Sequence, residues 1–532
     1  MAKGESCSFL IEKFSNVKSV ANLNTWNELT PTPDWNGCSN LLLGQQVCVS
    51  EGGYPNKKPA ENSDGSCHSY TVKSGDTCAA LASTYYPLTT DEIESYNSDT
   101  FGWYGCSKLT KGQKICLSAG TAPKPTTDEN AQCGATAPGD LYNTECPLNA
   151  CCSQYGYCGI TSDYCATTTS TTGAPGTFGC QSNCGYGSLH TSQAKTFRNI
   201  IYWLDSTGDL ASDPTQYSTS DYDTMHYAFV NINSDLTIDT SKLAVSDFLK
   251  VSQKKVVSFG GWDFSTSTST YEIFRNIVST STSRSNFASQ VVQLISDYDL
   301  DGVDLDWEYP AETGIADIPD DYSGNGKKFL SLIKTIKGSL PSGKTLSVAI
   351  PATYNYLKNY PVADMQSYVD YFVFMTYDLH GTWDDSTTTG VQCHTDLTAI
   401  SDAMLMLDKA GVKMWKLVGG IATYGHTYKL SSTSCTALGC AFSGAGDAGS
   451  VTNSAGILAD SEINAISSSS KKVKRWSDST INCDIMVYNT NNWVAWPKAS
   501  ERATLKTYFK DHAMGGSAIW AGNYLAHSAY TP

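Results

Sequence analysis

Four carboxylates fall within eight positions of an otherwise apolar stretch, "LDGVDLDWEYP" at residues 300–310. Because side chains alternate between the two faces of a strand, Asp304, Asp306 and Glu308 would share one face, whereas Asp301 would only begin the strand. Neighbouring buried carboxylates raise one another's pKa, so the terminal one keeps a proton at neutral pH. The pattern therefore predicts a general acid at Glu308 and a structural part for Asp301.

The elements that would position this ladder alternate between strands and helices from about residue 196. Eight such strands over about 330 residues indicate an α/β fold, a (β/α)8 TIM barrel, whose functional residues lie at the C-terminal ends of the strands. The strand segments are 198–205, 224–232, 254–261, 300–308, 345–353, 369–378, 416–424 and 515–522, and the helical segments include 284–298, 325–338, 396–410 and 499–512. The gap over 425–514 is too long for one helix and predicts an α+β insertion after strand seven.

The acidic stretch resembles a known catalytic signature. The sequence DGVDLDWE fits the D-G-x-D-x-D-x-E pattern of glycoside hydrolase family 18 chitinases at every fixed position. Three further motifs of that family fall on the expected strands: SFGGW (258–262) on the third, MTYD (375–378) on the sixth and Trp520 on the eighth. Together the motifs extend over residues 198–522, so the barrel is similar to that of an enzyme that hydrolyses β-1,4-linked N-acetylglucosamine polymers.

The resemblance implies a retaining mechanism in which the substrate assists its own cleavage. The acetamide oxygen of the sugar attacks the anomeric carbon and forms an oxazolinium ion. Glu308 would protonate the glycosidic oxygen and then activate water, while Asp306 would hold the acetamide N–H and offset the oxazolinium charge. Asp304 would take up the shared proton, helped by Tyr202 and Ser258.

The same resemblance assigns sugar contacts at the barrel mouth. Tyr377 would hold the acetamide oxygen and Asp378 the sugar hydroxyls. Trp520 would form the floor of the −1 subsite, Trp262 would stack on the +1 sugar, and Tyr424 would be a further substrate-binding residue. Tyr202 and Asp378 have an alternative reading as hydrogen-bonded barrel residues.

Two residues depart from the pattern of the family. The segment "ATYGHTY" (422–428) places His426 where the family often has arginine, so a distal sugar contact is expected to differ. The segment "WAGNY" (520–524) has Asn523 where an acidic residue is common. Neither belongs to the catalytic ladder. The insertion resembles the wall that deepens the groove in one branch of the chitinases.

The first 184 residues hold 15 of the 19 cysteines, a density typical of small disulfide-stapled modules in an oxidising compartment. They include an internal repeat, in which "VKSGDTC" (72–78) aligns with "MAKGESC" (1–7) and "GWYGCSKLTKGQKICLS" (102–118) with "DWNGCSNLLLGQQVCVS" (34–50). Both copies resemble LysM modules, βααβ domains that bind N-acetylglucosamine polymers. The first copy begins where its first strand should end, so we expect a truncated N-terminus, which would also account for the absent signal peptide.

In LysM modules the sugar lies between the loop after the first strand and the loop before the second. The resemblance therefore implies Gly75, Asp76, Thr77 and Asn97 as chitin contacts. The weaker counterparts in the first copy are Gly4, Glu5 and Ser6. The alternative is that the glycine and the aspartate only form a turn.

A third cysteine-rich segment carries eight cysteines in about 55 residues, too few for an apolar core, so disulfides would replace the core. Its stretch "CCSQYGYCG" (151–159), with Tyr164 beyond, resembles a hevein-type chitin-binding domain. The resemblance implies that Tyr155, Tyr157 and Tyr164 stack on sugar rings and that Ser153 holds an acetamide oxygen. It also implies the disulfides Cys133–Cys152, Cys146–Cys158, Cys151–Cys165 and Cys180–Cys184. In the barrel, Cys435 and Cys440 lie five apart and are expected to pair. Cys393 and Cys483 would then pair with each other.

The expected organisation is an incomplete LysM module at 1–50, a linker at 51–66, a LysM module at 67–118, a linker at 119–131, a hevein-type module at 132–185 and the barrel at 196–532. The formal net charge of −16 argues against nucleic acid or an anionic membrane as partner and leaves a neutral polymer unaffected. No zinc-ligand spacing accompanies the cysteines, and neither a metal nor a cofactor is expected.

We therefore expect a secreted, extracellular chitinase of fungal type that binds chitin or N-acetylglucosamine oligosaccharides through several weak sites acting together. The domain order also resembles the alpha subunits of yeast killer toxins, which combine chitin binding with a family 18 barrel to deliver a toxic partner subunit. That alternative stays open at this point. A catalytically weak chitin-binding lectin or effector is the other alternative.

Overall fold

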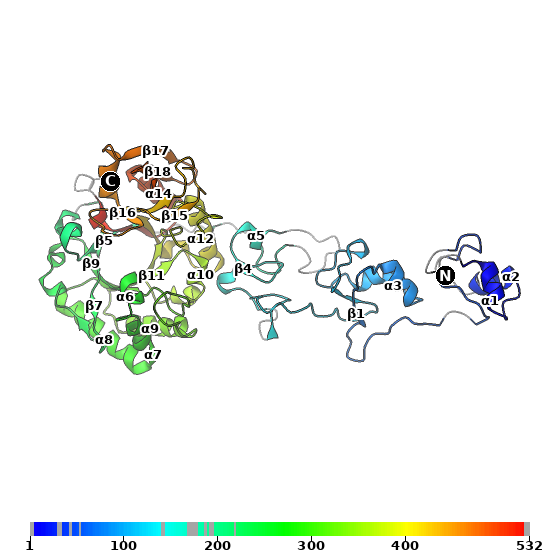
Figure 1. Ribbon diagram of the computed structural model, residues 1–532. Helices are drawn as coiled ribbons and strands as arrows, with labels where there is room; N and C mark the ends of the chain where they lie inside the picture. The colour runs from blue at the N-terminus through cyan, green and yellow to red at the C-terminus, as the bar shows by residue number, and fades with distance from the viewer. Residues whose placement is uncertain are drawn as a thin grey trace. The chain divides into compact units, whose positions relative to one another are not determined.

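The computed structural model describes residues 5–28, 35–41, 45–52, 55–139, 144–167, 179–185, 189–190, 196–217 and 220–525. The chain divides into two compact units: Met1–Cys146 with Ala150–Gly185, and Pro147–Asn149 with Tyr186–Pro532 (Figure 1). Across the described ranges, no helix is both long and apolar enough to span a bilayer.

The second unit contains a closed barrel of eight parallel strands in sequence order, in which the last strand pairs with the first. This confirms the predicted fold. The strands are β5 (Arg198–Leu204), β6 (Thr224–Ala228), β9 (Lys254–Gly260), β10 (Gly302–Asp306), β11 (Thr345–Pro351), β12 (Tyr371–Met375), β13 (Leu417–Ala422) and β20 (Gly516–Trp520). A short hairpin of β7 (Asn231–Ile232) and β8 (Ile238–Asp239) follows β6.

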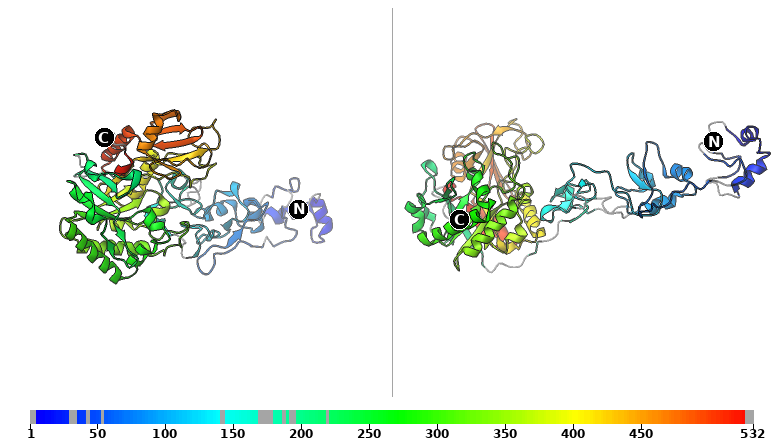
Figure 2. Two further views of the ribbon diagram at one scale, coloured as in Figure 1. Left: turned by 60° about the vertical axis from the view of Figure 1, so that its left-hand side comes forward. Right: turned by 90° about the horizontal axis from the view of Figure 1, so that it is seen from below.

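Helices connect the strands and cover the outside of the barrel (Figure 2). In α8 (Ser281–Tyr298) the buried residues Phe287, Val291 and Leu294 recur at helical spacing, so one face packs inward. Thr280 caps this helix in a capping box with Ser283. The other helices are α6 (Trp262–Thr266), α7 (Glu272–Ser279), α9 (Asn325–Ser339), α10 (Tyr354–Leu357), α11 (Val362–Met365), α12 (Leu397–Lys409) and α14 (Ala499–Asp511).

An antiparallel sheet is inserted after β13, in the strand order β15-β14-β19-β18-β17, with β16 paired to β14. Its elements are β14 (Tyr424–Leu430), β15 (Phe442–Ala445), β16 (Ile457–Ala459), α13 (Asp460–Ser467), β17 (Lys472–Asp478), β18 (Cys483–Tyr488) and β19 (Asn492–Trp496). The insertion is shorter than the predicted 425–514, because α14 packs against β13 and β20 and so belongs to the barrel. Disulfides join Cys435 to Cys440 and Cys393 to Cys483.

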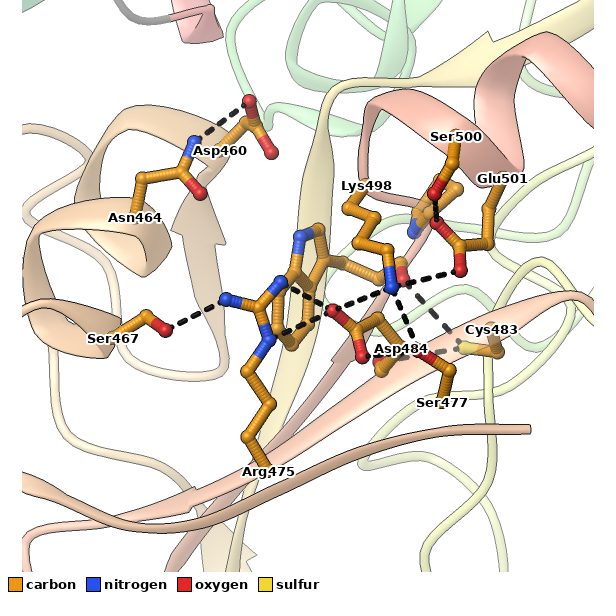
Figure 3. Close-up of polar contacts among 12 residues, drawn as sticks. Asp460, Asn464, Ser467, Arg475, Ser477, Cys483, Asp484, Lys498, Ser500 and Glu501 are labelled. Atoms are coloured by element: carbon orange, nitrogen blue, oxygen red, sulfur yellow. Dashed lines mark hydrogen bonds and ion pairs between the residues drawn. The ribbon is translucent and has the colours of Figure 1, made fainter.

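A buried carboxylate ties the inserted sheet to the start of α14. Asp484 on β18 is 1% exposed and accepts a hydrogen bond from Arg475 Nε at 2.8 Å and one from Ser477 Oγ at 3.0 Å (Figure 3). Lys498 Nζ lies 3.5 Å from Asp484 and 3.1 Å from Glu501 on α14. One buried anion is therefore shared by two strands and a helix start.

In the N-terminal unit, residues 69–116 form the predicted βααβ arrangement: β1 (Ser69–Thr71), α3 (Cys78–Thr84), α4 (Thr90–Tyr96) and β2 (Lys114–Cys116), with β1 and β2 antiparallel. Disulfides Cys67–Cys116 and Cys78–Cys106 close this module. The first copy has α1 (Cys7–Lys13), α2 (Val20–Glu28) and the disulfide Cys7–Cys38.

The third segment has little regular structure: β3 (Cys151–Cys152), β4 (Cys158–Gly159) and α5 (Ser162–Cys165). Four disulfides hold it, and they are the four pairs that the resemblance implied: Cys133–Cys152, Cys146–Cys158, Cys151–Cys165 and Cys180–Cys184.

Candidate active site

The lowest member of the acidic ladder is Asp304, which is fully buried in the middle of β10. The strand register places it level with Ser258 on β9 and Ser347 on β11. Its two oxygens accept hydrogen bonds from Tyr202 at 2.8 Å, Ser258 at 2.9 Å and Ser347 at 2.7 Å, and His226 Nδ1 lies 3.5 Å away. Burial alone would raise the pKa of Asp304, but these contacts, with His226 first, hold the pKa below its usual value. Asp304 is therefore the anion of the ladder before substrate binds.

Asp306 is 5% exposed, and its Oδ1 has no hydrogen-bond partner among the described residues. Burial raises its pKa well above the usual value, and the charges of Glu308 and Asp304 raise it further. The neighbouring strand allows this fit because residue 260 is glycine: a Cβ there would lie 2.0 Å from the Asp306 carbonyl oxygen. Gly260 also has a φ of +111°, which disfavours any other residue.

Glu308 lies two residues beyond the end of β10, at the barrel mouth. Its backbone N–H donates to Ser265 Oγ at 3.0 Å, which fixes the turn out of the strand. Burial raises the pKa of Glu308 to about 8; an interaction with Tyr309 opposes this shift, and the charges of Asp378 and Asp263 add to it. A carboxylic acid of this kind is protonated at neutral pH and can donate a proton.

A second group of polar side chains meets at the C-terminal ends of β12 and β13. Asp378 Oδ1 accepts a hydrogen bond from Tyr424 at 2.6 Å and lies 2.8 Å from His426 Nε2. His394 Nδ1 is 3.5 Å from the same oxygen. Burial would raise the pKa of Asp378. The contacts with His394 and His426 outweigh this effect and hold that pKa well below its usual value. The Tyr377 ring is buried and stands edge-on to Tyr424, with 6.1 Å between centroids.

Aromatic rings surround the two acidic groups. The Trp520 ring stands edge-on to Tyr202, with 5.2 Å between centroids, and therefore lies beside the ring whose hydroxyl donates to Asp304. Trp262 is 47% exposed, and Trp383, in the loop after β12, is 61% exposed and 5.2 Å from the His426 ring. Exposed flat rings beside polar groups suit a ligand with both apolar faces and hydroxyl edges.

The hevein-type segment presents one fully accessible ring. Tyr155 is 67% exposed at the tip of the β3–β4 hairpin, whereas Ser153 is 4% exposed and its Oγ accepts the N–H of Tyr157 at 3.1 Å. The Tyr164 ring packs on Gly159, where a Cβ would lie 2.4 Å from the ring. Three of the predicted residues thus lie in the turn between β3 and β4, and the fourth, Tyr164, lies on α5 of the same small segment.

The structure corrects one expected LysM contact. Asn97 is fully buried, and its amide donates to the carbonyls of Ile93 and Cys116, both at 2.8 Å, while its Oδ1 accepts the Cys116 N–H at 2.7 Å. It has no exposed surface with which to touch a sugar, so it connects α4 to β2. Asn27 makes the same three bonds, to Leu23 and Cys48, in the first copy.

The other expected LysM residues lie at the surface turn after β1. Gly75 is exposed with a φ of +88°, and Asp76 accepts hydrogen bonds from the Tyr70 hydroxyl at 2.8 Å and the Lys73 N–H at 2.7 Å. Thr77 caps α3, as Ser6 caps α1 in the first copy. Gly4 lies outside the described residues. Sugar contact at Gly75, Asp76 and Thr77 stays a prediction.

Family comparisons agree with this geometry. The model of glycosyl hydrolases family 18 matches residues 191–524. The chain belongs to this family. A chitin recognition protein model matches residues 132–184 and a LysM domain model residues 70–118, so the family 18 barrel is preceded by two kinds of chitin-binding module.

The relatives that match most of this family 18 chain include a killer toxin and fungal chitinases. It is 51% identical over 495 residues to the killer toxin subunits alpha/beta of Kluyveromyces lactis, a match that covers 92% of this chain and 43% of that protein. It is 37% identical over 524 residues to a probable chitinase, LysM18, of Penicillium expansum, covering 91% of this chain and 36% of that protein. The chain thus spans less than half the length of either relative.

A chitinase crystal structure from Trichuris suis, TsES1, superposes with a TM-score of 0.54 at 22% identity, covering 62% of this chain and 93% of that one. At this identity the likeness shows the fold alone. It agrees with the closed eight-stranded barrel of residues 198–520.

Sequence reasoning missed several residues of the family 18 site. His226 on β6 and Ser347 on β11 contact Asp304, and counting alternate positions along both strands from a lumen-facing residue would have found them. His426, which stands where the family often has arginine, is not at a separate distal position, because its Nε2 lies 2.8 Å from the Asp378 carboxylate. Asn523 holds the end of β5, accepting the Leu204 N–H at 2.8 Å. His394 sits in an irregular loop, for which no periodic signal exists.

Proposed function

We propose that the chain is a secreted chitinase that hydrolyses β-1,4 linkages between N-acetylglucosamine units with retention of configuration. The observation that carries this proposal is the buried Oδ1 of Asp306, which has no partner among the described residues and lies two positions before Glu308, whose pKa burial raises to about 8. An acetamide N–H would supply the missing donor to Asp306. The acetamide oxygen would then face the anomeric carbon as Glu308 protonates the leaving oxygen.

The remaining residues of the site fit successive steps of this reaction. The oxazolinium ion carries positive charge, which an ionised Asp306 would stabilise. Asp304, two positions below, is the anion of the ladder before the reaction, and it would take up the proton that Asp306 gives up as the positive charge develops. Tyr377 would hold the acetamide oxygen, and Asp378 the sugar hydroxyls. Water activated by the Glu308 carboxylate would then open the ring on the face from which the leaving group departed, giving the β-anomer.

The N-terminal modules would hold the enzyme on insoluble chitin. Tyr155 offers an exposed ring for stacking, with Tyr157, Tyr164 and Ser153 beside it. Each such site is weak, but linked sites raise one another's effective concentration. Binding at the LysM turn around Asp76 would add to this avidity. The neutral substrate is compatible with the net charge of −16.

A second candidate is a toxin subunit that docks on chitin and delivers a partner chain. The 51% identity to the killer toxin subunits over 92% of this chain favours it. Both candidates bind chitin. In the first, chitin hydrolysis is the function of the protein, whereas in the second it would help a toxic partner chain to enter the target cell. A catalytically weak lectin is the third outcome that an experiment must separate.

The test is hydrolysis of a soluble N-acetylglucosamine hexamer, with the anomer of the fresh product read by NMR. We expect β-anomer from the wild type and a loss of about 2 kcal/mol or more of transition-state stabilisation in Glu308→Gln. The matched control is Glu272→Gln on the outer helix α7, which should keep wild-type rates. If the folded wild type binds chitin beads but does not hydrolyse the hexamer, the proposed chitinase activity is refuted and a docking subunit or lectin is favoured.

A further inference from the structure

Three side chains at the barrel mouth form a cluster with the composition of a transition-metal site. Asp378 follows β12, His394 lies in the loop before α12, and His426 is on β14. Each offers one ligand atom, and these atoms all lie within 4.8 Å of one another. The Asp378 oxygen is 2.8 Å from His426 Nε2 and 3.5 Å from His394 Nδ1.

Backbone carbonyls fix which nitrogen of each ring carries the proton. His394 Nε2 lies 3.1 Å from the Tyr424 carbonyl oxygen, and His426 Nδ1 lies 3.3 Å from the Gly456 carbonyl oxygen. A carbonyl oxygen only accepts, so hydrogen on these two nitrogens satisfies both contacts. In that tautomer the lone pair of His394 Nδ1 accepts the Asp378 backbone N–H at 3.3 Å, and the lone pair of His426 Nε2 faces the Asp378 carboxylate.

With hydrogen on His426 Nε2 instead, that nitrogen donates to the Asp378 carboxylate at 2.8 Å. A cation bound between the two atoms would take the place of that hydrogen. The ring N–H of a metal-bound histidine is ordinarily held by a carbonyl or a carboxylate, as both rings are here. The Tyr424 hydroxyl also donates to Asp378 at 2.6 Å and would orient that carboxylate as a ligand.

We propose that Asp378, His394 and His426 bind a divalent transition-metal ion of the Zn²⁺ type. Zinc–nitrogen and zinc–oxygen bonds of about 2.0–2.1 Å place tetrahedral ligand atoms about 3.3 Å apart. The observed 2.8 and 3.5 Å lie on either side of that value. Two imidazoles and one carboxylate favour zinc over magnesium or calcium, which prefer oxygen ligands.

The site leaves a fourth coordination position for water. It also occupies Asp378, whose side chain is 48% exposed and is the proposed holder of sugar hydroxyls. If the proposed chitinase function holds, zinc and sugar compete for this carboxylate, and zinc is an inhibitor. Metal binding itself does not depend on that function, because it is measured without substrate.

The test is a titration of the full chain with Co²⁺, a zinc substitute whose visible absorption reports coordination by nitrogen, followed by displacement with Zn²⁺. We expect one saturable site per chain in the wild type. His426→Arg places a cation beside Asp378 and removes a metal ligand, so the affinity for Co²⁺ should fall at least tenfold. His394→Asn gives the same test through a second ligand, should His426→Arg fail to fold. His512→Asn, on a ring outside the site, is the matched control and should titrate like the wild type.

Two outcomes overturn the proposal: no saturable absorption at millimolar Co²⁺, or a His426→Arg titration that superimposes on that of the wild type. The first would indicate an imidazolium–carboxylate ion pair between His426 and Asp378, and the second would place the metal elsewhere. Hexamer hydrolysis gives a separate readout: zinc should inhibit the wild type and not His426→Arg. A chain that binds Co²⁺ at this site but hydrolyses nothing would refute the proposed function and leave the metal site standing.

Discussion

The raised pKa of Glu308 has a cost in stability that can be measured. In the unfolded chain the carboxyl titrates near 4.5, whereas in the folded barrel its pKa is about 8. Between these values the folded state binds more protons than the unfolded state, so the free energy of unfolding falls as pH rises through this window and is level above it. At about 1.4 kcal/mol per pKa unit, the loss is at most about 5 kcal/mol.

Glu308→Gln removes this titration while keeping the size and shape of the side chain. We expect the variant and the wild type to have similar stability near pH 4. As pH rises to 8–9, the free energy of unfolding of the variant should exceed that of the wild type by several kcal/mol, and by no more than about 5 kcal/mol. The assay is denaturant unfolding of the barrel at several pH values, followed by tryptophan fluorescence. Glu272→Gln controls for the loss of one surface charge. Parallel pH profiles for the wild type and Glu308→Gln would refute the reasoning, because Glu308 would then ionise as it does in water.

Three further predictions concern other parts of the molecule. Asp263→Asn should move the alkaline limb of kcat/KM to lower pH, because the charge of Asp263 raises the pKa of the acid Glu308; an unmoved limb in a pH–rate profile would contradict this. Tyr155→Ala should weaken binding to chitin beads about 3- to 10-fold through lost ring stacking and leave the melting temperature unchanged; full binding would exclude Tyr155 as a contact. Asp484→Ala should lower the free energy of unfolding by about 3 kcal/mol, measured by thermal unfolding. This is the lower end for a broken buried ion pair, because the side chains of its partners Arg475 and Lys498 are about one-third exposed. A smaller loss than in Lys498→Ala would contradict the shared-anion arrangement.

Much of the barrel could be predicted from the sequence, because strands and helices of a parallel barrel have strong periodic signals. All eight predicted strand segments contain an observed strand, and the ladder residues Asp304 and Asp306 share the predicted strand β10. The end of that strand was less accurate, since Glu308 lies beyond it. Strand ends depend on where the neighbouring strands stop pairing, which a single segment does not encode.

Contacts between distant segments could not be predicted in the same way. The cluster of Asp378, His394 and His426 joins a strand end, an irregular loop and an inserted strand, and no local pattern connects them. Asn97 was misassigned for a related reason. In a module this small, a polar residue can be fully buried because it supplies backbone hydrogen bonds that a larger core would provide through regular structure.

The ladder divides its electrostatic cost between two levels. Asp304, at the bottom, is an anion because hydroxyls from β5, β9 and β11 and an imidazole from β6 satisfy it. Its fixed charge, together with burial, then raises the pKa of Asp306 above it. A neutral residue at position 304 would remove that contribution and lower the pKa of Asp306. The acid at the barrel mouth keeps its proton through other groups, because burial and the charges of Asp378 and Asp263 raise the pKa of Glu308.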